Sequence, residues 1–473
     1  MTINILPDEV LLLIFHLDRM IYLEDNYHRL NQCWQWHRLV HVCRTWRSVV
    51  FGSPNFLQLR LVCHPSTRMG LTSIWPPLPI IITDIYEKFI SENYDFHAAI
   101  AYHNRVCEIN LINLASLQLE RLASAMMQVQ FPALIHLSLE FDDFATRGPA
   151  LPDEFLSGSV PCLQSLKLHS ITFPGLPKLL LSITHLVSLT LLNIPDSGYF
   201  SPKSIVTNLA ELANLKFLTI EFEIEFESLL SRSDPESRRP PPPTRAILPA
   251  LTHFKFQGIS EYLDDLVAQI DAPLLDFISV TFFHGLIFDT PQLARFMRRM
   301  TRFQALNEAH VDFYVDPMFY WGVQIGSLPL TQTSDDKSKL RIICDESDGL
   351  LSSLAQVCLS FFPSIYTVEH LYLYGMPQML QNHVANMPWL DILHPFAAVK
   401  SLYLSRMFAQ FIALALLDLV EEGVTEVLPT LESLFLEDLH PSGFVEEVIG
   451  NFVAVRQLSG HPVAISHWKR GAL

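Results

Sequence analysis

Residues able to ligate a metal or move a proton occur at suggestive spacings in two places. His37 and His41 are four residues apart, so a helix would place both imidazoles on one face. A zinc site needs further ligands, and none is close in the sequence, so surface positions are favoured. Glutamates alternate with apolar residues over 221–227, which is typical of a strand with one solvated acidic face. We therefore predict no metal site and no cofactor.

Two other charged groups also fit a surface role better than a binding role. Residues 345–349 (DESDG) are similar to the start of a calcium loop but lack the glutamate that closes one. Arg295, Arg298, Arg299 and Arg302 share one face of an expected helix; they could hold a phosphate, although a solvated helix face is the more usual explanation. The motifs of serine hydrolases, zinc proteases and P-loop proteins are absent from the sequence. We predict no catalytic residue, and the chain is not expected to be an enzyme.

Composition narrows the class of protein that could contain these residues. The chain has 473 residues, a net charge of −17, only 17% charged residues and a mean hydropathy of +0.25. So apolar a chain is not a disordered one, and its acidic balance argues against nucleic acid as a partner. Its apolar stretches are broken by polar residues, so no membrane partner is expected. Seven scattered cysteines suggest reduced thiols, and we expect a cytoplasmic and/or nuclear protein.

A repeated apolar pattern is the main signal of fold. The pattern P-x-L-x-x-L-x-L recurs with variations, and the copies begin at Leu134, Leu163, Leu186, Leu215, Leu251, Leu275, Val368, Val399 and Leu431, with weaker ones at Val106 and Leu306. One interval of 62 residues suggests a degenerate copy near 340–343. Helical spacing lies between copies, and Ser201-Pro202 and Thr290-Pro291 read as helix starts. One strand and one helix per unit predict an α/β fold, an irregular leucine-rich-repeat-like solenoid of horseshoe form.

The repeats depart from the usual pattern in two respects. Where a buried asparagine is expected after the last leucine, this chain has Ile171, Ile194, Ile259 and Phe283. Two polar, proline-rich or charged segments, at 231–245 and 331–339, interrupt the array and are predicted as flexible loops. We assign residues 105–473 to the solenoid and 63–104 to a linker.

Residues 1–62 form a separate, small all-helical module. Pro7 precedes a helix in which Val10, Leu13, Ile14 and Leu17 share one apolar face, while Leu11 and Phe15 form a second. A short helix that is apolar on two sides is expected to bury one side against a partner protein. A second helix is predicted over 36–50. Residues 26–83 contain six arginines and no Lys, Asp or Glu, so this window is +6 and the remainder is −23.

These residues carry a resemblance. Leu6-Pro7-Asp-Glu-Val followed by Ile14-Phe15, and then Leu39-Val-x-Val42-Cys43-Arg-x-Trp46-Arg, resemble an F-box. The chain as a whole resembles the F-box proteins with C-terminal leucine-rich-like repeats that are expanded in mushroom-forming (basidiomycete) fungi.

The resemblance implies a role in protein degradation. F-box proteins dock on the small acidic Skp-type adaptor, and through it on the cullin, of an SCF-type ubiquitin ligase, while their repeats bind a protein substrate. Carried over by position, the adaptor-binding residues would be Leu6, Pro7, Ile14, Phe15, Leu39, Val42, Cys43 and Trp46. The alternative is a scaffold or sensor outside any ligase that uses the F-box-like module for another partner.

The predicted substrate-binding residues come from the repeats themselves. In L-x-x-L-x-L units the residue between the last two core positions lies on the open face of the sheet. That column contains Tyr372, Tyr403 and Phe435 in successive repeats, with Tyr374 beside them. Stacked aromatic residues would form an exposed patch for substrate capture; cover by a neighbouring loop, such as residues 375–388, is nearly as plausible.

Overall fold

The computed structural model divides the chain into two compact units, Met1–Tyr199 and Phe200–Leu473. It describes residues 6–21, 31–63, 77–84, 100–141, 150–158, 160–223, 245–283, 291–300, 307–315, 321–326, 340–345, 365–375, 389–406, 408–409, 411–412, 414–416, 427–437 and 443–469. The predicted loops at 231–245 and 331–339 lie outside these residues, apart from Arg245. No helix in the described part is long and apolar enough to cross a membrane.

The first unit opens with three helices, α1 (Asp8–Ile21), α2 (Asn31–Val42) and α3 (Arg44–Gly52). Asp8 and Glu9 lie in the first turn of α1, where carboxylates favour the helix dipole. The helix packs through Leu11 and Phe15, which are 0% and 2% exposed. The Phe15 ring lies 4.7 Å from the ring of Trp46 on α3. The helical module therefore has a small core of its own.

The helix predicted over 36–50 is wrong in one respect, because it is two helices. Cys43 has an extended backbone (φ −158°, ψ 174°), and its thiol accepts a hydrogen bond from the Trp46 amide at 3.4 Å. It is therefore the N-cap of α3 and ends the preceding helix. The break turns α3 so that Val49 and Val50 are buried.

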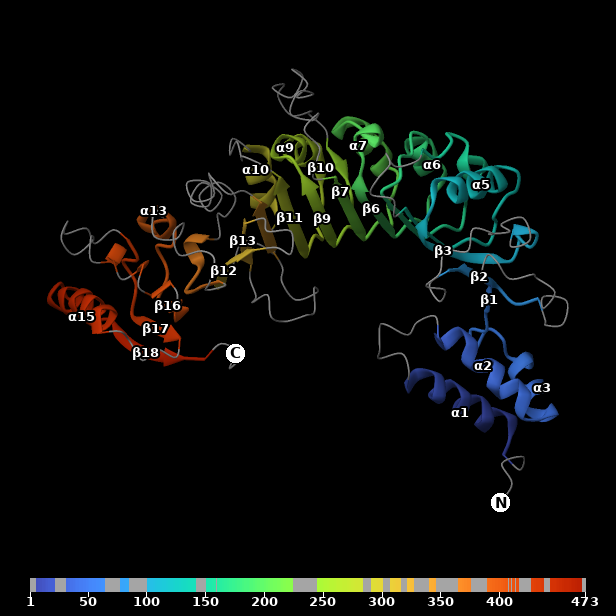
Figure 1. The fold of residues 1–473 in the computed structure, drawn as a ribbon, viewed down its shortest axis with the longest axis horizontal. Helices are drawn as coiled ribbons and strands as arrows, with labels where there is room; N and C mark the ends of the chain where they lie inside the picture. The colour runs from blue at the N-terminus through green and yellow to red at the C-terminus, as the bar shows by residue number, and fades with distance from the viewer. Residues whose placement is uncertain are drawn as a thin grey trace. The chain divides into compact units, whose positions relative to one another are not determined.

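A parallel sheet follows in the first unit, and α5 (Ser116–Met127) and α6 (Leu176–Ser182) cover one of its faces (Figure 1). Its strands lie side by side in chain order: β1 (Leu61–Cys63), β2 (Ile80–Thr83), β3 (Val106–Leu114), β4 (His136–Phe141), β5 (Ser165–His169) and β6 (Ser188–Ile194). The short 3-10 segments are η4 (Phe155–Gly158) and η5 (Asp196–Gly198).

The segment predicted as a linker, residues 63–104, contributes to this sheet. It holds β2 and the end of β1, and these strands pair with each other and with β3 in parallel. The reason is the run Ile80-Ile81-Ile82, whose side chains are all buried. The Trp36 indole of α2 donates to the Arg60 carbonyl at 3.0 Å, which ties the helical module to the start of β1.

Apolar residues alternate along the strands and meet in register. Ile109, Leu137, Leu166 and Leu189 form one buried row across β3–β6, and a second row two residues further on is Leu111, Leu139, Leu168 and Leu191. Burying each such side chain contributes about 1.5–3 kcal/mol. The periodic leucines of the sequence are therefore the core between sheet and helices, as predicted.

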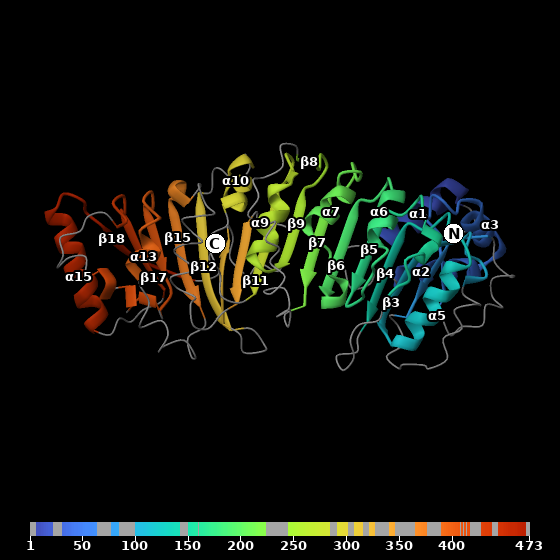
Figure 2. The ribbon, with the colours of Figure 1, turned by 90° about the horizontal axis from the view of Figure 1, so that it is seen from above.

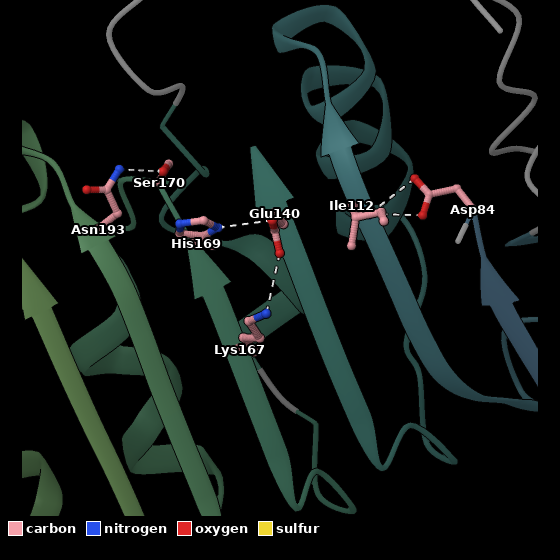
Figure 3. Close-up of polar contacts among 7 residues, drawn as sticks. All are labelled: Asp84, Ile112, Glu140, Lys167, His169, Ser170 and Asn193. Atoms are coloured by element: carbon pink, nitrogen blue, oxygen red, sulfur yellow. Dashed lines mark hydrogen bonds and ion pairs between the residues drawn. The ribbon is translucent and has the colours of Figure 1, made fainter. Parts of the chain in front are cut away.

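Polar residues at the strand ends satisfy the backbone where the usual asparagine is missing. Ile171 and Ile194 are buried, and the residues just before them, Ser170 and Asn193, have positive φ of 57° and 49°. The Asn193 amide donates to the Ser170 hydroxyl at 2.8 Å (Figure 3). Directly after β2 the buried carboxylate of Asp84 accepts from the amide of Ile112 at 2.9 and 3.1 Å (Figure 3). In the repeats of β5 and β6 the polar residue therefore lies one position before the expected asparagine.

The second unit contains a longer sheet, with strand order β7-β9-β11-β14-β13-β12-β15-β16-β17-β18. The strands are β7 (Phe217–Phe222), β9 (His253–Gly258), β11 (Phe277–Phe283), β12 (Glu308–Val315), β13 (Trp321–Gly326), β14 (Leu340–Asp345), β15 (His370–Gly375), β16 (Ser401–Leu404), β17 (Ser433–Glu437) and β18 (Ala464–Trp468). A two-stranded pair, β8 (Ala246–Ile247) and β10 (Ile270–Asp271), lies beside it in sequence.

The strand expected near 340–343 exists, but its place in the sheet differs from a simple repeat. β14 pairs in parallel with β11, whereas β12 pairs in parallel with β15. The antiparallel strand β13 lies between them and pairs with both. The three strands form a meander inserted into an otherwise parallel sheet, and this is why the repeat spacing doubles there.

Helices of the second unit begin where the sequence indicates. Ser201 caps α7 (Pro202–Leu209) by accepting from the Ser204 amide at 3.2 Å. Further helices with bounds inside the described residues are α9 (Ser260–Ala268), α10 (Pro291–Arg299), α13 (Trp389–Leu393) and α15 (Gly443–Leu458), with the 3-10 segment η8 (Ile365–Thr367). Figure 2 shows α9 and α10 over the strands β9 and β11.

Candidate functional site

The helical module exposes an unusual amount of apolar surface along α1. The exposed residues are Leu6 (38%), Val10 (38%), Leu13 (54%), Ile14 (40%) and Leu17 (59%). Leu6 precedes the helix, the other four belong to the first of its two apolar faces, and the second face is the one that packs inward. A contiguous row of large apolar side chains on a small module is typical of a protein-binding surface.

The predicted adaptor-binding residues do not all lie on that surface. Leu6, Pro7 and Ile14 are exposed, and Val42 at the end of α2 is 57% exposed. Phe15 is buried, so its side chain belongs to the core of the module and not to the exposed surface of α1. The remaining three, Leu39, Cys43 and Trp46, are half-buried.

Most of the exposed apolar residues along α1 were not among the predicted adaptor-binding residues. Val10, Leu13 and Leu17 are exposed on α1, and their helical spacing was visible in the sequence. What sequence reasoning lacked was which of the two apolar faces packs against α3. Phe56 is also 48% exposed, and its ring lies 5.1 Å from that of His16 on α1.

Cationic side chains surround the end of α2 and the start of α3. Arg38, Arg44 and Arg47 are exposed, and Arg47 donates from Nε to the Val40 carbonyl at 2.9 Å. Burial, together with the neighbouring His41, lowers the pKa of His37. Since a neutral imidazole is favoured there, the arginines carry the positive charge of the described part of this region. The arrangement would attract an acidic partner.

The predicted aromatic column forms a continuous stack across the second unit's sheet. Ring centroids are 4.1 Å apart between Tyr372 and Tyr403, and 4.3 Å apart between Tyr403 and Phe435, with nearly parallel planes. His310 of β12 extends the stack, with its imidazole 4.2 Å from the Tyr372 ring. These residues are cross-strand partners in register, which is why the rings meet.

Only one end of this stack faces solvent, which corrects the prediction of a fully exposed patch. Tyr372 and Tyr374 are 3% and 2% exposed, whereas Tyr403 and Phe435 are half-buried. Trp468 of β18 is the cover that the structure describes. Its indole lies edge-on to Tyr372 and Tyr403, and its Nε1 donates to the Leu404 carbonyl at 3.2 Å. The loop considered as cover, residues 375–388, lies outside the described residues beyond Gly375.

His310 is the one strongly perturbed histidine among the described residues. It is 4% exposed, its Nδ1 lies 2.8 Å from the Tyr374 hydroxyl, and its Nε2 lies 3.6 Å from a Glu308 carboxylate oxygen. Burial lowers its pKa to about 4. The imidazole is therefore neutral near pH 7. Burial also raises the pKa of the neighbouring Tyr372, so its hydroxyl stays protonated near pH 7.

A second aromatic row lies on the same sheet and was not predicted. Phe217, His253 and Phe277 are cross-strand partners, with ring centroids 4.8 and 5.5 Å apart. The Lys255 ammonium lies 5.6 Å from the Phe277 ring centroid. The signal was available, because these residues occupy the position just before the first core residue of each strand.

The open face of the first unit's sheet is polar instead. Glu140 accepts from Lys167 at 3.4 Å and lies 3.3 Å from the His169 imidazole (Figure 3). The hydrogen bond with His169 and the charge of Lys167 lower the pKa of Glu140. These half-buried charged groups lie in register on neighbouring strands. The described residues contain no group of three or more potential metal ligands.

Comparison with known proteins adds no identification. No model of a protein family matches the chain, and a search of the curated proteins finds no matching relative. The geometry of the two surfaces is therefore the basis for assigning a function.

Proposed function

We propose that this protein is a non-catalytic substrate receptor of an SCF-type ubiquitin ligase. In this proposal α1–α3 are an F-box that docks a Skp-type adaptor and through it the cullin. The remaining α/β part is an irregular leucine-rich-repeat-like solenoid that binds a protein substrate. The protein would act in the cytoplasm or nucleus.

The observation that carries the proposal is the exposed apolar face of α1. Three of its residues, Leu13, Ile14 and Leu17, are at least 40% exposed although the same helix buries Leu11 and Phe15. Such a face costs solubility unless a partner covers it. The exposed arginines Arg38, Arg44 and Arg47 of the same module match an acidic adaptor in charge. The F-box-like residue pattern indicates that this adaptor is of the Skp type.

The double variant Leu13→Asp/Leu17→Asp tests the docking. Because two charges would enter an apolar contact centre, we expect adaptor binding to weaken at least about 100-fold in a titration with purified Skp-type adaptor. The matched control is Leu117→Asp on α5, where an equally exposed leucine (57%) lies outside the module; this variant should bind normally.

Two results would count against the ligase assignment. Unchanged binding by the double variant would place the contact elsewhere. A chain that folds stably and never binds a Skp-type adaptor would instead favour the scaffold or sensor role, in which the module serves another partner.

Substrate capture is assigned to the solvent-facing end of the aromatic stack. Tyr403 and Phe435 present half-exposed rings, and aromatic residues are frequent anchors of protein interfaces. We expect Tyr403→Ser/Phe435→Ser to lose most partners found by proximity labelling after proteasome inhibition. Phe217→Ser, a change of a 42% exposed ring elsewhere on the sheet, is the control. Retention of every partner by the double variant would exclude this surface.

A further inference from the structure

The strand β18 is an open edge of the second unit's sheet. It is the last strand in the sheet order, and in the described residues it pairs with β17 alone. The Ala464 amide donates to the Glu432 carbonyl at 2.8 Å, so Ala464 directs its backbone groups toward β17. Backbone direction alternates along a parallel strand. The N–H and C=O groups of Ile465 and His467 therefore point outward from the sheet.

This edge lacks the features that normally prevent strand pairing. β18 contains no proline and no Lys, Arg, Asp or Glu, and its register with β17 is unbroken by a bulge. Over residues 450–468 the one such charged residue is Arg456, which is 6% exposed and donates to the Leu428 and Pro429 carbonyls. Lys469, which directly follows β18, is exposed, and residues 450–469 contain no Asp or Glu, so the end of the sheet has no acidic residue.

Apolar side chains are exposed beside the same edge. Ile465 continues the core row Leu371–Leu402–Leu434, yet it is 45% exposed, since no further strand of the described part of the chain lies beside it. Leu458 at the end of α15 is 88% exposed. An apolar side chain at the end of a core row becomes buried when another strand pairs with the edge.

We propose that β18 pairs with β18 of a second copy of this chain in an antiparallel two-fold arrangement centred on Ser466. In that register Ile465 lies opposite His467 of the second copy. These are the two residues whose backbone groups point outward, so each hydrogen-bonds to the other. Ala464 lies opposite Trp468, whose indole is directed back over Tyr372 and Tyr403 and so leaves the edge free. The strand is thus complementary to itself.

Charge favours a second copy meeting at this end. Each chain carries −17, so two copies repel one another across most of their surface. The repulsion between acidic surfaces is smallest where acidic residues are absent, and residues 450–469 contain none. The inference is independent of the ligase proposal, since neither α1 nor the adaptor takes part.

The mass of the full-length chain in solution tests the pairing. Light scattering coupled to size exclusion, from micromolar concentrations upward, should give twice the mass of one chain. Ile465→Lys places a like charge at the two-fold interface and should give the mass of one chain. Ile465→Pro removes an outward N–H while leaving the bonds to β17, and should do the same. Thermal unfolding of both variants should resemble that of the natural chain.

Two controls separate this edge from other surfaces. Leu117→Lys changes an exposed leucine of the first unit, and Leu17→Lys changes the exposed face of α1; both should keep the mass of two chains. A natural chain with the mass of one chain at every concentration would overturn the proposal. Dimers of Ile465→Lys, or a monomer produced by Leu17→Lys, would do so equally.

Discussion

Acid should destabilise the second unit through His310, by about 2 kcal/mol between pH 7 and pH 5. The pKa of this buried imidazole is lowered to about 4, whereas an unfolded histidine titrates near 6.5. Between these values the unfolded chain binds a proton that the folded chain excludes. Stability is therefore complete above pH 6.5 and is lost as the pH falls toward 4. The full difference corresponds to about 3 kcal/mol.

Urea unfolding at pH 7 and pH 5 measures this effect. His310→Phe keeps a ring against Tyr372 but cannot titrate, so its stability should fall by about 2 kcal/mol less than that of the natural chain over this interval. His185→Asn, which changes an exposed histidine, is the matched control and should leave the pH dependence unchanged. Identical pH dependence of the natural chain and His310→Phe would show that His310 is accessible to protons in the folded state.

Gly175→Ala should lower the stability of the first unit by about 3 kcal/mol. A Cβ at this position would lie 2.5 Å from the backbone oxygen of Asp153 and 2.7 Å from its Cα. Backbone atoms cannot rotate away as a side chain could, so either α6 or the turn at Asp153 must move. Gly175 also caps α6, where its carbonyl accepts from the Leu179 amide at 3.0 Å.

The same substitution at Gly450 provides the control. Gly450 lies inside α15, and nothing lies within 4 Å of a Cβ built there. Alanine has the higher helix propensity, so Gly450→Ala should stabilise the second unit by about 0.5–1 kcal/mol. Denaturant midpoints of both variants, followed by circular dichroism, give the comparison. Equal effects of the two changes would contradict the role of steric contact at Gly175.

Much of the fold could be predicted because it is encoded by local periodicity. Leu166 and Leu168 are buried with Lys167 between them on the open face, as alternation along a strand requires. Ser201 caps its helix because serine before proline suits that position. Tyr372, Tyr403 and Phe435 stack because equal spacing within repeats brings equivalent residues into register.

Other features depend on contacts between distant segments. The meander of β12–β14 places β14 beside β11, and this pairing has no signal in the spacing of apolar residues. The burial of Tyr372 depends on Trp468, which comes from the last strand of the sheet. An alternating pattern identifies which residues share a face, but not what covers that face.

The helical module shows the same division between sequence and tertiary structure. Sequence by itself determined that α1 has two apolar faces, because Leu11 and Phe15 repeat at one helical spacing and Val10, Ile14 and Leu17 at another. Only the tertiary structure decided which face is left for a partner. Cys43 caps α3 and so places Trp46 against Phe15, and a side chain packed against a ring in the core cannot also face solvent.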